Sequence, residues 1–177
     1  LTAVISYLRT IPPVDKKVQN KDLNILGKVV NAFLLKPVGP SGDVKAVVTE
    51  DNTLAYGEYL AKSVANCYGC HTDRDLTTGA FIGPDFAGGL KIDAAGHPGK
   101  FYVTRNLTPD SKYGQIFQWD EEQFLNRFHS GKVYDDSPMP WESFKNISDK
   151  DLKAIYTYLK SLKPVAKDPG PVIVVEK

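Results

Sequence analysis

The most informative segment of this 177-residue sequence is Asn66-Cys67-Tyr68-Gly69-Cys70-His71. The chain has 2 cysteines, and both are here. A disulfide across so short a loop is geometrically awkward and adds little stability. Residues three apart on a helical turn face the same side, so both sulfurs can reach one bound group beside the imidazole. The spacing therefore indicates a shared cofactor or metal ion.

The pattern C-x-x-C-H is the motif of covalent c-type haem attachment. Two sulfurs one turn apart can reach the two vinyl groups along one edge of a haem, while the adjacent imidazole turns under the iron. We expect Gly69 to leave room for that close approach. The motif therefore predicts one haem c, with its iron, held by Cys67, Cys70 and His71.

The cysteine pair has three other interpretations, namely a zinc site, a redox pair and a chance match to the motif. A zinc site needs four ligands, so the fourth would come from His97, His129 or a carboxylate. A thioredoxin-like redox pair belongs in a strand-helix setting, and little of this sequence is typical of strands. Haem attachment remains the favoured hypothesis.

Composition describes an ordinary globular chain. Apolar residues make up 42% and charged residues 24%, and 22 basic against 21 acidic side chains give a formal charge of +1. Such a balance gives no overall electrostatic attraction to nucleic acid or to an anionic membrane surface. No stretch approaches the roughly 20 consecutive apolar residues of a membrane helix. We expect no nucleic-acid partner and no membrane span in this chain.

Four stretches predict helices, at residues 22–35, 53–66, 120–131 and 148–162. Ser148 can cap the last helix, and Asp120 with Gln123 forms a capping box at the start of the third. The Gly- and Pro-rich segments 79–99 and 108–114 are expected to be loops and turns rather than strands. The expected fold class is all-α with long loops.

An internal repeat links the two ends of the sequence. Residues 1–14 (LTAVISYLRTIPPV) align with residues 152–165 (LKAIYTYLKSLKPV), including the proline after each helix. Two amphipathic helices ending in proline can look alike by chance, yet amphipathicity does not require the matching tail. We expect residues 1–14 to be the closing helix of a preceding similar domain. Residues 15–50 then form a linker with one helix, residues 51–165 the main domain and residues 166–177 a C-terminal tail.

Residues 51–165 resemble a class I cytochrome c domain, like the mono-haem units of multi-haem cytochrome c subunits of bacterial dehydrogenases. The resemblance is carried by five segments: YGEYLAKSVANCYGCH (56–71), IGPDFAGG (82–89), RNLTPDSKYGQIFQWDEEQF (105–124), SPMPWESF (137–144) and ISDKDLKAIYTYLKSLKPV (147–165). It implies a cytochrome c-like helical fold around one covalent haem, with the N-terminal helical extension outside it.

The resemblance also implies a second iron ligand, Met139, which is the single methionine of the chain. It lies between Pro138 and Pro140, whose fixed backbone angles hold a loop in one extended shape. Methionine is otherwise a common filler of core gaps. His97 and His129 are the competing ligands, although a lone histidine more often makes surface or capping contacts.

Further roles follow from the resemblance alone. The carbonyl of Pro84 matches the acceptor for the ring N–H of the axial histidine. The remaining matches are the residues beside the haem propionates, Arg105, Asn106 and Trp119, and a close helix crossing at Gly57 and Tyr158.

A haem iron with both axial positions filled by protein side chains favours electron transfer over catalysis. We therefore expect a single-electron carrier rather than an enzyme. The alternative is a haem-based sensor or a peroxidase-like module in which the sixth ligand is displaced. The expected partners are redox proteins: a dehydrogenase, an oxidase or another cytochrome, and a preceding haem domain in the full-length chain. The resemblance implies a periplasmic or outward-facing location.

Overall fold

The computed structural model describes residues 2–17, 22–35, 48–51, 53–75 and 77–176. The chain forms two compact units, Leu1–Val44 and Lys45–Lys177. Residue 1 of the predicted N-terminal helix and residues 18–21 and 36–47 of the predicted linker lie outside the described residues, as does residue 177 of the tail. Within the described ranges, none of the helices combines the length and the apolar composition that a bilayer-spanning helix needs.

The first unit holds two short helical segments. Helix α1 spans Thr2–Thr10, and α2 (Ile25–Val29) continues into a π-helical turn, η1 (Val30–Leu34). Asn24 caps α2, because its side-chain oxygen accepts the backbone N–H of Gly27 at 2.8 Å. None of the described residues of this unit is buried.

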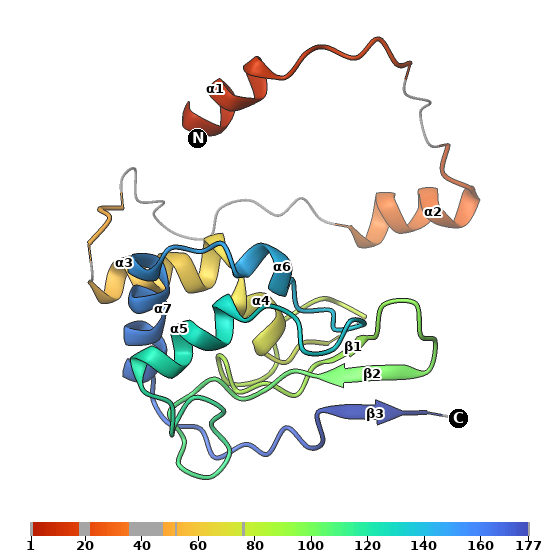
Figure 1. Ribbon diagram of the computed structural model, residues 1–177. Helices are drawn as coiled ribbons and strands as arrows, with labels where there is room; N and C mark the ends of the chain where they lie inside the picture. Colours follow the sequence, from red (N-terminus) through yellow and green to blue (C-terminus); the bar gives the residue numbers. More distant parts are fainter. Residues whose placement is uncertain (1, 18–21, 36–47, 52, 76, 177) are drawn as a thin grey trace. The chain divides into compact units, whose positions relative to one another are not determined.

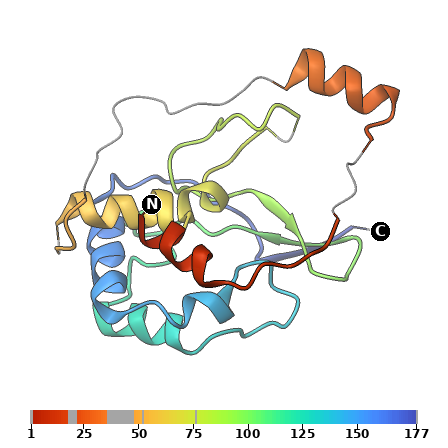
Figure 2. The same ribbon diagram turned by 90° about the horizontal axis from the view of Figure 1, so that it is seen from above.

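The second unit has its helices at one end and a small sheet at the other (Figures 1 and 2). Its helical elements are α3 (Leu54–Tyr59) with the π-helical continuation η2 (Leu60–Val64), α4 (Cys67–His71), α5 (Glu121–His129), α6 (Trp141–Phe144) and α7 (Asp149–Ser161). The apolar core lies between α3, α5 and α7. The predicted helices of this unit are confirmed.

Helices α3 and α7 cross at Gly57. A Cβ atom at this position would lie 2.2 Å from the carbonyl oxygen of Ala154 and 2.7 Å from Cβ of Tyr158. Only glycine allows so close an approach of two helix backbones. The expected crossing of Gly57 and Tyr158 is confirmed.

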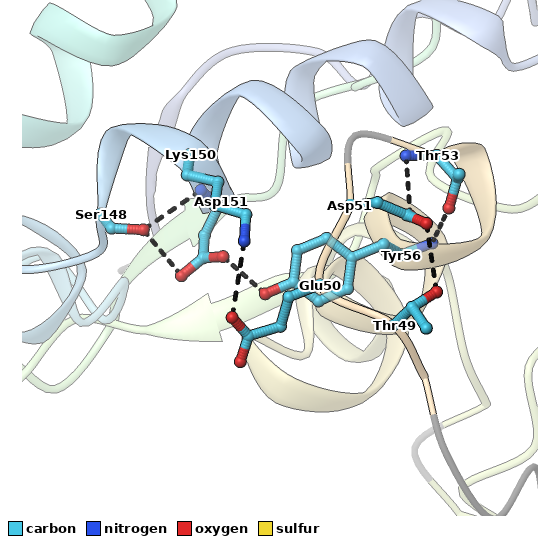
Figure 3. Close-up of polar contacts among 8 residues, drawn as sticks. All are labelled: Thr49, Glu50, Asp51, Thr53, Tyr56, Ser148, Lys150 and Asp151. Atoms are coloured by element: carbon cyan, nitrogen blue, oxygen red, sulfur yellow. Dashed lines mark hydrogen bonds and ion pairs between the residues drawn. The ribbon is translucent and has the colours of Figure 1, made fainter.

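The first turns of α3 and α7 are also joined by hydrogen bonds (Figure 3). Tyr56 Oη donates to Asp151 Oδ1 at 2.6 Å, and Lys150 Nζ pairs with Glu50 at 3.5 Å. Ser148 caps α7 as predicted, by accepting the backbone N–H of Asp151 at 3.2 Å. The predicted capping box of α5 is present as well, between Asp120 and Gln123.

The all-α expectation is wrong for the far end of the second unit, which is a three-stranded antiparallel sheet. Its strands β1 (Lys91–Asp93), β2 (Lys100–Val103) and β3 (Ile173–Val175) lie in that order, with Ile92 opposite Tyr102 and Tyr102 opposite Ile173. Strands of 3 or 4 residues are too short for an alternating pattern to stand out in a sequence. The third strand also comes from the predicted tail, far from its partner along the chain.

Candidate functional site

The helical turn α4 carries both cysteines and the histidine. Asn66 precedes it in the left-handed conformation, with φ 51°, and its side chain lies over Gly69. A Cβ atom on Gly69 would be 2.5 Å from Asn66 Oδ1. Gly69 therefore makes room for the side chain of Asn66, which differs from the expected role beside a cofactor.

Cys67 and Cys70 line the same cavity, as their spacing on one helical turn predicts. Cys67 is buried and Cys70 is exposed, and the two do not form a disulfide. Burial raises the pKa of the Cys67 thiol to about 11, so this sulfur is a protonated thiol at neutral pH.

His71 is oriented by a backbone carbonyl. Its Nδ1 lies 2.8 Å from the carbonyl oxygen of Arg105. A carbonyl can only accept, so Nδ1 carries the proton and Nε2 keeps its lone pair free for a metal. Burial lowers the pKa of His71, which favours the neutral imidazole that ligates iron.

The structure gives this contact to a different carbonyl from the expected one. Pro84 O accepts the backbone N–H of Ala87 at 3.2 Å, and Pro84 does not line the cavity. The backbone of His71 is held nearby, because its carbonyl accepts the N–H of Gly88 at 2.7 Å. The family resemblance predicted an acceptor on the segment of Pro84. The structure instead has it on a different loop, at Arg105, because more than one loop passes close to His71.

Asn106 also differs from its expected place beside a haem propionate. Its side chain is fully buried and does not line the cavity. The amide nitrogen donates to the carbonyls of Val165 at 2.8 Å and Lys167 at 3.1 Å, while the amide oxygen accepts from the backbone and the hydroxyl of Thr108. These contacts use the hydrogen-bonding groups of the amide within the protein. Asn106 therefore attaches the C-terminal segment to the core.

The cavity has a volume of about 690 Å³, within the usual range for cofactor sites. Apolar side chains from distant parts of the chain line it, among them Leu107, Ile116, Phe128, Ile155, Leu159 and Val172. Met139 lines the same cavity, and so do its neighbours Pro138 and Pro140. The structure thus brings the thioether into the cavity that holds the two thiols and the imidazole.

Arg105 and Trp119 also line this cavity. Arg105 Nη1 donates to the carbonyl of Gly170 at 2.7 Å, whereas its Nε is buried without a hydrogen-bond partner in the structure. This N–H has no acceptor within the protein, so it is available to an anionic group bound in the cavity. An apolar cavity with an unpaired guanidinium N–H fits a haem, whose ring is apolar and whose propionates are acidic.

The competing histidines lie elsewhere. Neither His97 nor His129 lines the cavity. His129 Nδ1 contacts the carbonyl of Lys145 at 2.9 Å, and its Nε2 contacts Asp149 Oδ1 at 2.8 Å. His97 is exposed in the turn between β1 and β2. Within the described ranges, no group of three His, Cys, Asp or Glu side chains is arranged so that it could hold a metal ion.

Sequence reasoning missed two parts of this site. Val172 and the carbonyl of Gly170 come from the predicted tail, and no motif in that segment indicates a role. Asp136 contacts β2 three residues before Met139 and was also missed. Its only signal was its position in the loop of Met139, because its partners belong to a strand that was not predicted.

Two thiols and an imidazole on one helical turn, a thioether in the same apolar cavity and a helical core around it define a c-type haem-binding domain. The family model described as cytochrome c matches residues 54–163. The chain belongs to the cytochrome c family.

Curated relatives are similar over the same portion of the chain. The cytochrome c subunit of alcohol dehydrogenase (quinone) from Gluconacetobacter polyoxogenes is 34% identical over 116 residues, covering 63% of this chain and 22% of its own length. The gluconate 2-dehydrogenase cytochrome c subunit from Pantoea cypripedii is 35% identical over 121 residues, covering 66% and 25%. The fructose dehydrogenase cytochrome subunit from Gluconobacter japonicus is 34% identical over 119 residues, covering 64% and 22%. The chain thus spans about a quarter or less of the length of these relatives.

Proposed function

We propose that the second unit holds one haem c through Cys67 and Cys70, with its iron between His71 and Met139, and carries single electrons. The observation that carries this proposal is that all four side chains line one apolar cavity. When bound, the haem supplies an iron that gains and loses one electron. The electron-carrier role itself follows from membership of the cytochrome c family.

The protein's own residues prepare the site for that chemistry. The carbonyl of Arg105 fixes the tautomer of His71 and leaves Nε2 as the ligating atom. Met139 contributes a neutral thioether, and a His/Met pair raises the reduction potential relative to two histidines. The apolar lining excludes water from the redox centre, which favours the less charged state of the iron.

Arg105 and Trp119 are proposed to contact the haem propionates. The buried, unpaired Nε of Arg105 supports this role, because a carboxylate would supply the missing acceptor. Arg105 then holds both the imidazole, through its carbonyl, and a propionate, through its side chain. Asn106 and Pro84 are left out of the proposed contacts because their hydrogen bonds serve other segments.

We propose that the electron donor is a dehydrogenase partner, as the names of the three relatives suggest. The acceptor would be an oxidase or another cytochrome. The domain itself would not be a catalyst, since both axial positions of the iron are assigned to side chains. Covalent haem attachment in bacteria implies a periplasmic or outward-facing location. A sensor or peroxidase-like module would instead need a displaceable Met139.

The test is an optical spectrum of the purified protein, oxidised and reduced, followed by acid-acetone extraction. Haem that stays with the chain, together with a weak sulfur-to-iron band in the oxidised state, is the expected result. Met139→Ala should remove that band and allow carbon monoxide to bind the reduced protein. The matched control is Ser143→Ala, another residue of the cavity wall, which should leave both properties unchanged. Fast binding of carbon monoxide to the parent protein would favour the sensor or peroxidase-like alternative.

The repeat supports a second proposal, that α1 belongs to a preceding domain of the same kind. Tyr158 and Leu159 are 8% and 1% exposed, whereas the aligned Tyr7 and Leu8 are 68% and 56% exposed. The residues that bury the face of α7 are thus present on α1 without being buried. If a similar haem domain precedes residue 1 in the natural protein, that protein contains more than one haem per chain, and a ratio of one would refute this organisation.

A further inference from the structure

Asp136 attaches the loop that carries Met139 to the sheet. This loop, residues 131–140, connects α5 with α6. Asp136 Oδ2 accepts a hydrogen bond from Lys100 Nζ at 2.5 Å, and Oδ1 accepts one from Tyr102 Oη at 2.6 Å. Both donors lie on β2, and the Asp136 side chain is 12% exposed. The carboxylate therefore joins the loop to the central strand of the sheet.

Two further contacts join the same two parts of the molecule. The backbone N–H of Ala95, in the turn between β1 and β2, donates to the carbonyl of Asp136 at 3.0 Å. The rings of Tyr102 and Tyr134 lie with their centroids 6.1 Å apart. The side chain, the backbone and a neighbouring aromatic ring thus hold the same stretch of the loop.

The carboxylate is well suited to this contact. Hydrogen bonds from Lys100 and Tyr102 lower the pKa of Asp136 to about 2, so the group is ionised at neutral pH. An ionised carboxylate only accepts, and both of its neighbours donate. Charge-assisted hydrogen bonds of this kind are stronger than neutral ones.

A displacement at Asp136 is transmitted to Met139 over a short and stiff connection. The two residues between them are Ser137 and Pro138, and Pro140 follows the methionine. Proline fixes one backbone angle, so this segment moves largely as a unit. A thioether is neutral, so no attraction between charges holds it to the iron. Its bond to the iron therefore depends on where the loop places the sulfur.

We infer that Asp136 is a positioning residue for Met139, holding the thioether in the haem cavity through the contact with β2. The inference rests on the proposed function, in which Met139 is an iron ligand. It assigns the small sheet a role at the redox centre, although no strand residue is an iron ligand.

The test uses the haem-loaded protein and the variants Asp136→Asn and Tyr102→Phe. The matched control is Asp135→Asn, because Asp135 precedes Asp136 and is exposed. The sulfur-to-iron band is followed during heating, together with far-ultraviolet circular dichroism of the helices. Carbon monoxide binding to the reduced protein is measured at room temperature.

In Asp136→Asn the band is expected to disappear at temperatures where the helices remain folded. Carbon monoxide should bind at least about tenfold faster than in the parent, because weaker anchoring raises the fraction of open loop. Tyr102→Phe removes a single hydroxyl and should give a smaller effect in the same direction, even if Asp136→Asn does not fold. The control should match the parent.

An Asp136→Asn protein that folds, keeps its band until the helices melt and binds carbon monoxide at the parent's rate would overturn the inference. The same holds if Asp136→Asn does not fold and Tyr102→Phe behaves as the parent does. A parent protein without the sulfur-to-iron band would instead overturn the proposed ligation by Met139, and the inference with it. The two failures are therefore distinguished by the parent protein's spectrum.

Discussion

Gly57 lets the backbone of α3 approach α7 within a distance that no side chain allows. Gly57→Ala would place a methyl group 2.2 Å from the carbonyl oxygen of Ala154, which belongs to a helix backbone and cannot move aside. The gain in helix propensity, at most about 1 kcal/mol, does not offset this clash. We expect the haem-loaded protein to lose about 2 kcal/mol in free energy of unfolding, measured with urea.

Gly27→Ala is the matched control for this substitution. A Cβ atom at Gly27 would be 3.2 Å from Cβ of Leu23, which belongs to the first unit. Its effect on the urea midpoint of the second unit should be negligible. Equal midpoints for Gly57→Ala and the parent would mean that α3 and α7 do not cross as described.

His129 gives the protein a pH-dependent contribution to stability. The carbonyl of Lys145 and the carboxylate of Asp149 accept from its two ring nitrogens, and these contacts raise its pKa. The folded protein therefore binds this proton more tightly than the unfolded chain does. The stabilisation is fully present below the unfolded pKa of about 6.5 and disappears as the pH rises through the higher folded value.

We expect His129→Gln to lower the free energy of unfolding more at about pH 5.5 than at about pH 8.5. Urea unfolding at both pH values measures the difference. His97→Gln, at an exposed histidine, is the control and should change the free energy of unfolding little. A loss of equal size at both pH values would show that the charge of His129 does not contribute.

At the level of elements, the segment 164–176, called the strap below, is hydrogen-bonded to the loops that contact His71. Asn106 holds its start, Arg105 contacts Gly170, and β3 pairs with β2. The family match ends at residue 163, so this strap lies outside it. The strap and its strand β3 therefore lie beyond the residues that the family model matches, whereas β1 and β2 lie within them.

Lys167 is the charged contact of this strap. Its Nζ donates to Asp73 Oδ2 at 3.0 Å and to the carbonyl of Gly88 at 2.7 Å. Lys167→Met leaves the Gly88 carbonyl without this donor and should lower the free energy of unfolding by about 1 kcal/mol. Lys163→Met, at an exposed lysine four residues earlier, should have little effect in the same urea experiment. Equal stabilities of the two variants would argue against the strap as a stabilising element.

At the level of the whole molecule, the hydrophobic core of the second unit is built from residues of that unit alone. A protein beginning at residue 45 should therefore keep the haem spectrum of the full chain. Its free energy of unfolding should change by less than about 0.5 kcal/mol, as for changes away from a core. Spectra and urea unfolding of the two proteins test this, and a large loss of stability would make the first unit part of the fold.

Local chemistry made much of the site predictable. The turn from Cys67 to His71 is defined by spacing along one helix, and the caps at Asp120 and Ser148 depend on neighbours three residues away. The crossing at Gly57 came from the family resemblance and is confirmed by the packing. The proposed ligand Met139 was singled out by its proline neighbours and by the same resemblance.

The contacts of Arg105, Asn106 and Asp136 could not be obtained in this way. Each depends on which distant segment lies opposite, and a side chain or carbonyl has the same chemistry wherever the chain places it. The carbonyl beside His71 belongs to Arg105, whereas the carbonyl of Pro84 accepts the N–H of Ala87. The order of amino acids was enough to predict the attachment motif, the main helices and the family. The carbonyl that orients His71 and the way the sheet and the strap are built were established by folding, because these features depend on hydrogen bonds between residues far apart in the chain.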